Sequence, residues 1–203
     1  MTYPYRSLCV FCGSADGLDQ VYYDSAFEMG QLLADKNITL VYGAGRTGLM
    51  GSVAEGALQK GGEVIGVVPK GLESPQLIYT TGLTRLEIVE DIQQRKARMN
   101  ELSEGFISLP GGFGTIDETF EVLTWSQIGL HRKPTAFLNV NGYFDRLLDW
   151  FDRAYADRFI YKEHKDLYVT DPTPSGLLDK LAAFTFPDNI GRWLIREEQI
   201  QSK

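Results

Sequence analysis

The 203-residue chain has only two cysteines and two histidines, which leaves little material for a disulfide framework or a metal site. Cys9 and Cys12 form a C-x-x-C inside the apolar run 8–12. Residues three apart in a strand point to opposite faces, whereas redox C-x-x-C pairs lie at the start of a helix. We therefore expect two buried, reduced thiols. His131 and His164 are far apart in the sequence, and no metal is expected.

Long apolar runs and an excess of positive charge are also lacking. No stretch reaches the roughly 18 apolar residues of a membrane span, and the N-terminus does not place a basic segment before an apolar one. The formal net charge of −7 argues against a general nucleic-acid or anionic-membrane surface. We expect a cytoplasmic protein whose partner is a small molecule, with no nucleic acid and no membrane involved.

What the chain does contain is a regular alternation of short apolar runs and helical segments. Strands are predicted at 7–12, 38–42, 63–68, 86–89, 106–109, 135–140 and 168–170. Helices are predicted at 21–35, 49–59, 91–102, 116–127, 143–158 and 174–184. This pattern predicts an α/β fold with a mostly parallel sheet covered by helices on both faces. No repeat or linker divides it, so we predict one domain over residues 1–186 and a C-terminal tail over 187–203.

The segment PGGFGTIDE at residues 110–118 carries the strongest chemical signal. A predicted strand precedes it and a predicted helix follows it, which is the arrangement of a phosphate site at a helix N-terminus. Glycines let the backbone approach an anion closely, and Thr115 adds a hydroxyl. Glu118 would repel a phosphate, so we expect it to act on a neighbouring part of the ligand.

A structural role for Glu118 stays open at this point. The pair Thr115-x-x-Glu118 is also a capping box, in which both side chains bind the first N–H groups of the helix. Two glycines in the turn and a third immediately before Thr115 favour the ligand-binding interpretation.

Glycine turns also follow the strands predicted at 7–12 and 38–42, and in a parallel sheet all three turns meet at the carboxyl edge, where ligands bind. The second turn, GAGRTG at 43–48, matches the dinucleotide pattern G-x-G-x-x-G. The next strand nevertheless ends without the acidic residue that would hold a ribose. No G-x-x-x-x-G-K-[ST] motif is present either. The sequence therefore does not favour a dinucleotide enzyme or a P-loop nucleotidase.

Arg95 is the second candidate for chemistry. On the helix predicted at 91–102 it falls on the apolar stripe formed by Ile92, Met99 and Leu102. An arginine on an inward face requires a carboxylate or a phosphate as partner. Glu118 and a phosphorylated ligand are the two candidates.

The segment QRKARM at 94–99, followed by the 110–118 motif, resembles the LOG (Lonely Guy) family, whose signature is P-G-G-x-G-T-x-x-E after an upstream R-K-x-x-M. The likeness extends over segments from residue 9 to about residue 185. The chain departs from the family pattern at Ala15 and Ala44, at Gln93 in place of a frequent histidine, and at 74–77, which lacks a glutamate found in plant members. These departures concern the preferred base more than the reaction type.

The resemblance implies a Rossmann-like three-layer sandwich and a single nucleotide-binding domain. It further implies a phosphoribohydrolase, which cleaves the N-glycosidic bond of a nucleoside 5′-monophosphate, a cytokinin riboside 5′-monophosphate or AMP, to free base and ribose 5-phosphate. Relatives often carry the label lysine decarboxylase, but no pyridoxal-phosphate lysine site is evident and no cofactor is expected. The resemblance also implies a homodimer with sites near the interface, for which 125–130 is a candidate contact, although such a helix is more often core.

The motif and the resemblance together give a set of candidate site residues. Arg95 and Glu118 are the predicted catalytic pair, with Arg95 expected to lower the pKa of Glu118. The predicted substrate-binding residues are Gly13, Ser14, Gly43, Lys96, Met99, Gly111, Gly112, Phe113, Gly114 and Thr115. A non-catalytic carrier of a nucleotide or of the molybdenum cofactor on the same fold remains the alternative.

Overall fold

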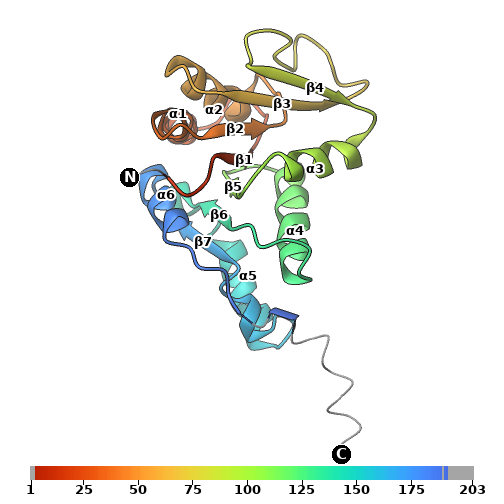
Figure 1. The fold of residues 1–203 in the computed structure, drawn as a ribbon. Helices are drawn as coiled ribbons and strands as arrows, with labels where there is room; N and C mark the ends of the chain where they lie inside the picture. The colour runs from red at the N-terminus through yellow and green to blue at the C-terminus, as the bar shows by residue number, and fades with distance from the viewer. Residues whose placement is uncertain (1–2, 189, 192–203) are drawn as a thin grey trace, which may run out of the picture.

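The computed structural model describes residues 3–188, 190 and 191, and a seven-stranded sheet runs through its centre (Figure 1). The strands are β1 (Ser7–Phe11), β2 (Thr39–Tyr42), β3 (Val64–Pro69), β4 (Arg85–Val89), β5 (Phe106–Ser108), β6 (Thr135–Leu138) and β7 (Tyr168–Asp171). Their order is β4-β3-β2-β1-β5-β6-β7, and every neighbouring pair is parallel. The predicted parallel sheet is confirmed.

In the described part of the chain, six α-helices cover the two faces of this sheet. They are α1 (Gln20–Asp35), α2 (Gly48–Gln59), α3 (Ile92–Glu101), α4 (Phe113–Gln127), α5 (Asp145–Ala156) and α6 (Pro174–Ala182). Buried residues of α1, α2 and α6 share one apolar cluster with the sheet, while α3 and α4 pack into another and α5 into a third. The fold is therefore the expected Rossmann-like three-layer sandwich.

The central strand β1 shows how the two faces are built from one apolar run. Cys12 belongs to the cluster beneath α1 and α2, whereas Cys9 belongs to the cluster beneath α3 and α4. Both thiols are free and buried, and burial raises the pKa of each above its ordinary value. The interpretation of the C-x-x-C as two separate core cysteines is confirmed.

The sheet extends from β1 in both directions, and the order in which strands are added reverses there. From β1 the strands proceed through β2 and β3 to β4 at one edge, and α3 then returns the chain to β5 on the other side of β1. The carboxyl ends of β1 and β5 are consequently neighbours at a topological switch point, where ligands bind in open α/β sheets. A backbone hydrogen bond of 3.0 Å from Gly13 N to Pro110 O joins the two turns there.

The segment that follows β6 differs from the prediction. Strand 135–140 and helix 143–158 were expected to be almost continuous, but a 3-10 turn, η1 (Val140–Gly142), lies between them. Asn141 and Gly142 have positive φ, which ends the extended backbone. The Asn139 side chain then accepts a hydrogen bond from Phe144 N and donates one to Asp145, so that α5 begins at Asp145.

A second 3-10 turn, η2 (Lys162–His164), was also not predicted. Its His164 is buried, and its Nε2 atom contacts the carbonyl oxygen of Ile190 at 2.9 Å. Of the predicted tail 187–203, only residues 187, 188, 190 and 191 are described, and the rest lies outside the described residues. Within the described part of the chain, no helix has the length and apolarity needed to cross a membrane.

Candidate active site

A cavity of about 560 Å³ opens at the carboxyl ends of β1 and β5. Ten of the twelve predicted site residues line it: Gly13, Ser14, Gly43, Arg95, Met99, Gly112, Phe113, Gly114, Thr115 and Glu118. Its volume lies in the range of about 300–1,000 Å³ typical of small-molecule sites. Gly111 and Lys96 do not line the cavity. The structure thus gathers segments that are about 100 residues apart in the sequence.

The glycine motif forms the first turn of α4. Gly112 precedes the helix, which begins at Phe113, three residues before the predicted start at residue 116. The first N–H groups of a helix have no acceptor within it, and here the N–H of Ile116 is the first to bind back, to Gly112 O at 3.1 Å. The N–H groups of Phe113, Gly114 and Thr115 remain available to an anion.

The capping-box alternative is wrong. Gly112, which has no side chain, occupies the N-cap, and the Glu118 carboxylate binds Arg95. Thr115 is already within the helix, and its carbonyl accepts a hydrogen bond of 2.6 Å from Thr119 Oγ1. Because that bond uses the only hydroxyl hydrogen of Thr119, the buried Ser108 hydroxyl must donate to Thr119 Oγ1 across 2.6 Å. This chain of bonds fixes the start of α4 against β5.

Gly111 has a packing role beside the cavity. A Cβ atom at this position would overlap the Thr115 side chain, so only glycine allows Thr115 to pack against the turn. The turn after β1 is held as firmly: Gly13 O accepts a hydrogen bond from Leu49 N at 2.9 Å, and Ser14 O accepts one from Thr47 Oγ1 at 2.7 Å. The backbone around the cavity is therefore preorganised.

Arg95 and Glu118 form the predicted pair. Arg95 Nη1 lies 3.0 Å from Glu118 Oε1, and Arg95 Nε donates to Val67 O at 3.1 Å. The two side chains are only 14% and 12% exposed. A Cβ at Gly43 would overlap the guanidinium, which explains a glycine there. The inward orientation of Arg95 is confirmed, but the stripe used to predict it is partly wrong, because Ile92 is exposed.

Arg95 acts on the pKa of Glu118 in the expected direction, but the pKa as a whole is raised above its ordinary value. Burial of the carboxyl group is the largest effect and raises its pKa, and the Arg95 guanidinium opposes that shift without cancelling it. The neighbouring Asp117 carboxylate raises the pKa further. The site therefore holds a carboxyl group that takes up a proton more readily than an ordinary glutamate.

Lys96 lies next to this pair but faces another direction. Its Nζ atom is 3.1 Å from Asp117 Oδ2 and 3.0 Å from Glu121 Oε1, and its side chain is largely buried. The lysine therefore joins α3 to α4 outside the cavity, instead of lining the cavity as a predicted substrate-binding residue would.

Part of the cavity wall is apolar. Besides Met99, it is lined by Met50, Val68, Pro69, Leu72, Leu77 and Ile78. Leu72 and Leu77 lie on the connection between β3 and β4 and are 53% and 54% exposed. Arg46 holds this connection in place: its N–H donates to Leu77 O at 3.0 Å and its Nη1 to Pro75 O at 2.9 Å.

Sequence reasoning missed this apolar wall. The segment that carries Leu72 and Leu77 has neither strand nor helix periodicity and no motif. The only signal would have been an apolar residue in an otherwise polar connection next to a glycine turn, which is too common to indicate a site.

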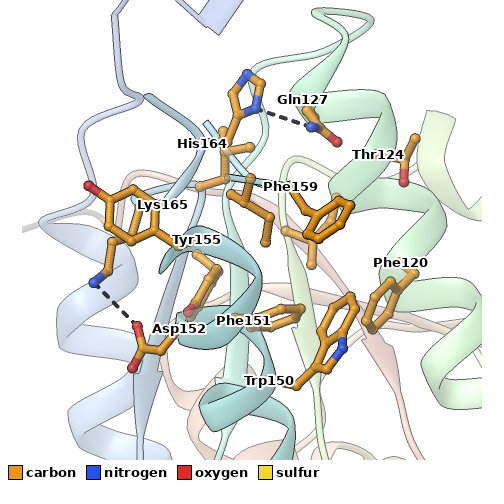
Figure 2. A pocket seen from close by; sticks show the side chains of 14 residues that line it. Phe120, Thr124, Gln127, Trp150, Phe151, Asp152, Tyr155, Phe159, His164 and Lys165 are labelled. Carbon is orange, nitrogen blue, oxygen red and sulfur yellow. Dashed lines mark hydrogen bonds and ion pairs between the residues drawn. The ribbon is translucent and has the colours of Figure 1, made fainter. Parts of the chain in front are cut away.

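A second cavity, of about 190 Å³, lies between α4, α5 and η2. Figure 2 shows the aromatic side chains of Phe120, Trp150, Phe151 and Phe159 around it. At its rim His164 Nδ1 is 3.1 Å from Gln127 Nε2, and Lys165 pairs with Asp152 at 3.2 Å. It shares no lining residue with the first cavity and contains none of the predicted site residues. Its charged groups are already paired, so it is not the candidate active site.

Comparisons with known proteins agree with this geometry. Residues 50–181 match the sequence family described as "Possible lysine decarboxylase". A protein of Oryza sativa subsp. japonica named as a probable cytokinin riboside 5′-monophosphate phosphoribohydrolase is 45% identical over 181 residues, which cover 89% of this chain and 72% of the relative. A cytokinin riboside 5′-monophosphate phosphoribohydrolase of Arabidopsis thaliana is 44% identical over 180 residues, covering 89% and 83% of the two chains.

Among solved structures, the molybdenum cofactor binding protein of Rippkaea orientalis is similar with a TM-score of 0.66 and 18% identity, covering 87% of this chain and 95% of that one. This likeness shows a common fold and nothing more. The identity and coverage of the plant relatives, together with the 110–118 motif at the cavity, show that the chain belongs to the LOG family.

Proposed function

We propose that the protein is a phosphoribohydrolase, which hydrolyses the N-glycosidic bond of a nucleoside 5′-monophosphate to free base and ribose 5-phosphate. The observation that carries the proposal is the Arg95–Glu118 pair, held at 3.0 Å in the same cavity as the free N-terminus of α4. Relatives about 45% identical are named for this reaction with cytokinin riboside 5′-monophosphates.

The α4 N-terminus supports a position for the 5′-phosphate. The N–H groups of Gly112, Phe113, Gly114 and Thr115 and the positive end of the helix dipole would bind the phosphate oxygens. Glu118 follows one turn later on the same helix, so a ligand anchored in this way brings its ribose toward the carboxylate.

The proposed reaction needs only water as a second substrate. As the bond between C1′ and the base nitrogen breaks, its electron pair leaves with the base and positive charge develops on the ribose. The Glu118 carboxylate would stabilise that charge and take a proton from the water that attacks C1′. The departing base would take up a proton from solvent, and Glu118 would release its proton to solvent, which regenerates the carboxylate. Arg95 would keep Glu118 oriented toward the sugar.

The apolar wall supports a substrate whose base carries an apolar group. Leu72 and Leu77 line the same cavity as the α4 N-terminus and are about half exposed. An N6-isopentenyl group on adenine would bury apolar surface there that AMP cannot. We therefore propose cytokinin riboside 5′-monophosphates as preferred substrates and AMP as the weaker one.

The residues do not fit a pyridoxal-phosphate decarboxylase, in spite of the family description. Such an enzyme requires a lysine that forms a Schiff base with the cofactor, and no lysine lines the cavity among the described residues. Lys96, the nearest in sequence to the pair, is held by two carboxylates outside it.

We further propose a single nucleotide-binding domain over residues 1–186, a cytoplasmic location and a homodimer. The two unpaired thiols suit a reducing compartment. Exposed apolar side chains at Ile128 and Leu130, beyond the C-terminal end of α4, suit contact with a second copy.

One experiment tests the activity directly. The purified protein is incubated with AMP and with isopentenyladenosine 5′-monophosphate, and free base and ribose 5-phosphate are separated and quantified. We expect both products in equal amounts, and no base from the corresponding nucleosides, which lack the phosphate anchor. Glu118→Gln serves as the control and should retain binding of ribose 5-phosphate but release no base.

Full activity of Glu118→Gln would contradict the assigned role of the carboxylate. Tight binding of nucleotides by the wild-type protein without release of base would favour the carrier alternative.

A further inference from the structure

Tyr143 makes a contact with the glycine turn that the proposed reaction does not use. It follows η1, and its hydroxyl donates a hydrogen bond of 2.7 Å to the carbonyl oxygen of Gly111. Its ring is fixed from two sides, edge-on to Phe144 at 5.1 Å and to Tyr22 at 5.9 Å between centroids. The tyrosine lies outside the cavity and is partly exposed.

The Gly111 carbonyl shares a peptide plane with the N–H of Gly112. All peptide bonds described are trans, so the two groups point in opposite directions. Because the carbonyl points to Tyr143, the Gly112 N–H points away from it. Gly112 lines the cavity, whereas Gly111 and Tyr143 do not. The hydrogen bond therefore sets the direction of a donor at the phosphate end of the site.

This peptide plane is unusually free to rotate, because both of its flanking residues are glycine. A rotation by half a turn would take φ of Gly112 from −92° to the positive side, which glycine tolerates and other residues do not. The rotated plane would present the Gly111 carbonyl oxygen to the phosphate. Among the described residues, Tyr143 is the one group that binds this carbonyl.

We propose that Tyr143 is a positioning residue for phosphate: it holds the 111–112 peptide with its N–H turned toward the anion. The inference rests on the proposed function for its ligand, a 5′-phosphate, but its own content is the orientation of one peptide plane. Tyr143 touches neither the reacting atoms nor the cavity, and it acts only through Gly111.

Tyr143→Phe tests the proposal, since it removes the hydroxyl and keeps the ring contacts. We expect KM for the nucleotide to rise about fivefold, the factor that corresponds to a typical net hydrogen bond, with kcat changed by less than about twofold. Affinity for ribose 5-phosphate, measured by calorimetry, should fall by the same factor. Tyr22→Phe is the matched control, because it keeps the ring that packs on Tyr143 and should leave both values unchanged.

A second measurement reads the peptide plane itself. In ¹⁵N-labelled protein, inorganic phosphate should shift the amide resonance of Gly112 in the wild type and in Tyr22→Phe, and should shift it less in Tyr143→Phe. Unchanged KM and unchanged phosphate affinity in Tyr143→Phe would overturn the proposal. So would a variant whose only defect is a lower melting temperature with a lower kcat.

Failure of the proposed function and failure of the positioning role of Tyr143 give different experimental results. If the wild-type protein releases no base from any nucleotide, the proposed function fails, but weaker phosphate binding by Tyr143→Phe would still support the positioning role. If base release is normal and phosphate binding is insensitive to Tyr143→Phe, the positioning role fails alone.

Discussion

At Glu118 two opposing effects act on one carboxyl group. Burial disfavours its charged form, and the guanidinium of Arg95 favours it. The motif and the helix position indicated that these two residues would meet, and they do. The depth of their burial could not be predicted, because it depends on how β3, α3 and α4 pack together. The motif therefore predicted the right partner for Glu118, but not the upward net shift of its pKa.

The raised pKa of Glu118 makes a prediction for the pH dependence of activity. The proposed reaction requires the carboxylate, and a raised pKa means that this form is lost at a higher pH than for an ordinary glutamate, whose pKa is about 4.3. We expect kcat/KM to fall as the pH is lowered, and the midpoint of that fall should lie above about pH 4.3. Arg95→Gln removes the positive charge that opposes the upward shift of the Glu118 pKa, so the midpoint of the fall in kcat/KM should move to still higher pH. A midpoint at or below about pH 4.3 would contradict the conclusion that burial raises the pKa of Glu118.

Removal of Arg95 should cost stability as well as turnover. In Arg95→Ala the Glu118 carboxylate keeps its buried position and loses its cation, and breaking a buried pair in this way typically costs about 3–5 kcal/mol. The free energy of unfolding, measured with urea at neutral pH, should fall by about 3 kcal/mol. The double variant Arg95→Ala, Glu118→Ala should recover part of that loss, because no unpaired carboxylate remains.

Equal losses in the single and double variants would show that the packing of Arg95, and not its charge, stabilises the fold. Normal base release by Arg95→Ala would remove this arginine from the proposed site.

At the scale of elements, the strands and helices were predictable where their periodicity was strong, and their ends were not. The apolar runs predicted the five inner strands most clearly, because a strand buried on both faces needs near-continuous apolar residues, whereas the edge strands β4 and β7 are only partly buried. The start of α4 was misplaced by three residues because Gly114, in the first turn of the helix, has poor helix propensity. The hydrogen bonds of Thr119 oppose that propensity: one joins it to Thr115 O within the helix, and the other joins it to Ser108 of β5, a tertiary contact that no local pattern reveals.

The connection between β3 and β4 gives a prediction for substrate preference. Leu72 and Leu77 supply exposed apolar surface to the cavity, and Leu77→Ser would remove part of it without touching Arg95, Glu118 or the α4 N-terminus. We expect the ratio of kcat/KM for isopentenyladenosine 5′-monophosphate to that for AMP to fall about tenfold. This factor corresponds to roughly 1.4 kcal/mol, just below the range for burying one leucine.

The value of kcat/KM for AMP itself is the internal control in that experiment. It should change little, because AMP lacks the isopentenyl group that the proposed function places against the leucine side chain. A loss that is equal for both substrates would place Leu77 in general packing, and the preference for the base would then arise elsewhere in the cavity.

At the scale of the whole molecule, the topology explains why distant motifs form one site. The chain begins in the middle of the sheet, builds one half outward to β4, and returns through α3 to build the other half. Two glycine turns thus meet at the carboxyl ends of β1 and β5, and the return through α3 brings Arg95 above β3 and beside α4. Alternation of strands and helices predicted a parallel sheet, but it did not give the position of β4 at the edge.

Association with a second copy is the prediction that belongs to the whole molecule. Leu130 lies just beyond α4, is 69% exposed and belongs to the predicted contact 125–130. We expect light scattering after gel filtration to give the mass of two chains for the wild type. Leu130→Lys should shift the protein toward one chain, because a charge would then be buried in an apolar contact. Phe159→Lys is the matched control: Phe159 is 81% exposed on the rim of the second cavity, so this variant should stay dimeric. If Phe159→Lys dissociates the dimer and Leu130→Lys does not, the interface lies over the second cavity, away from the proposed active site.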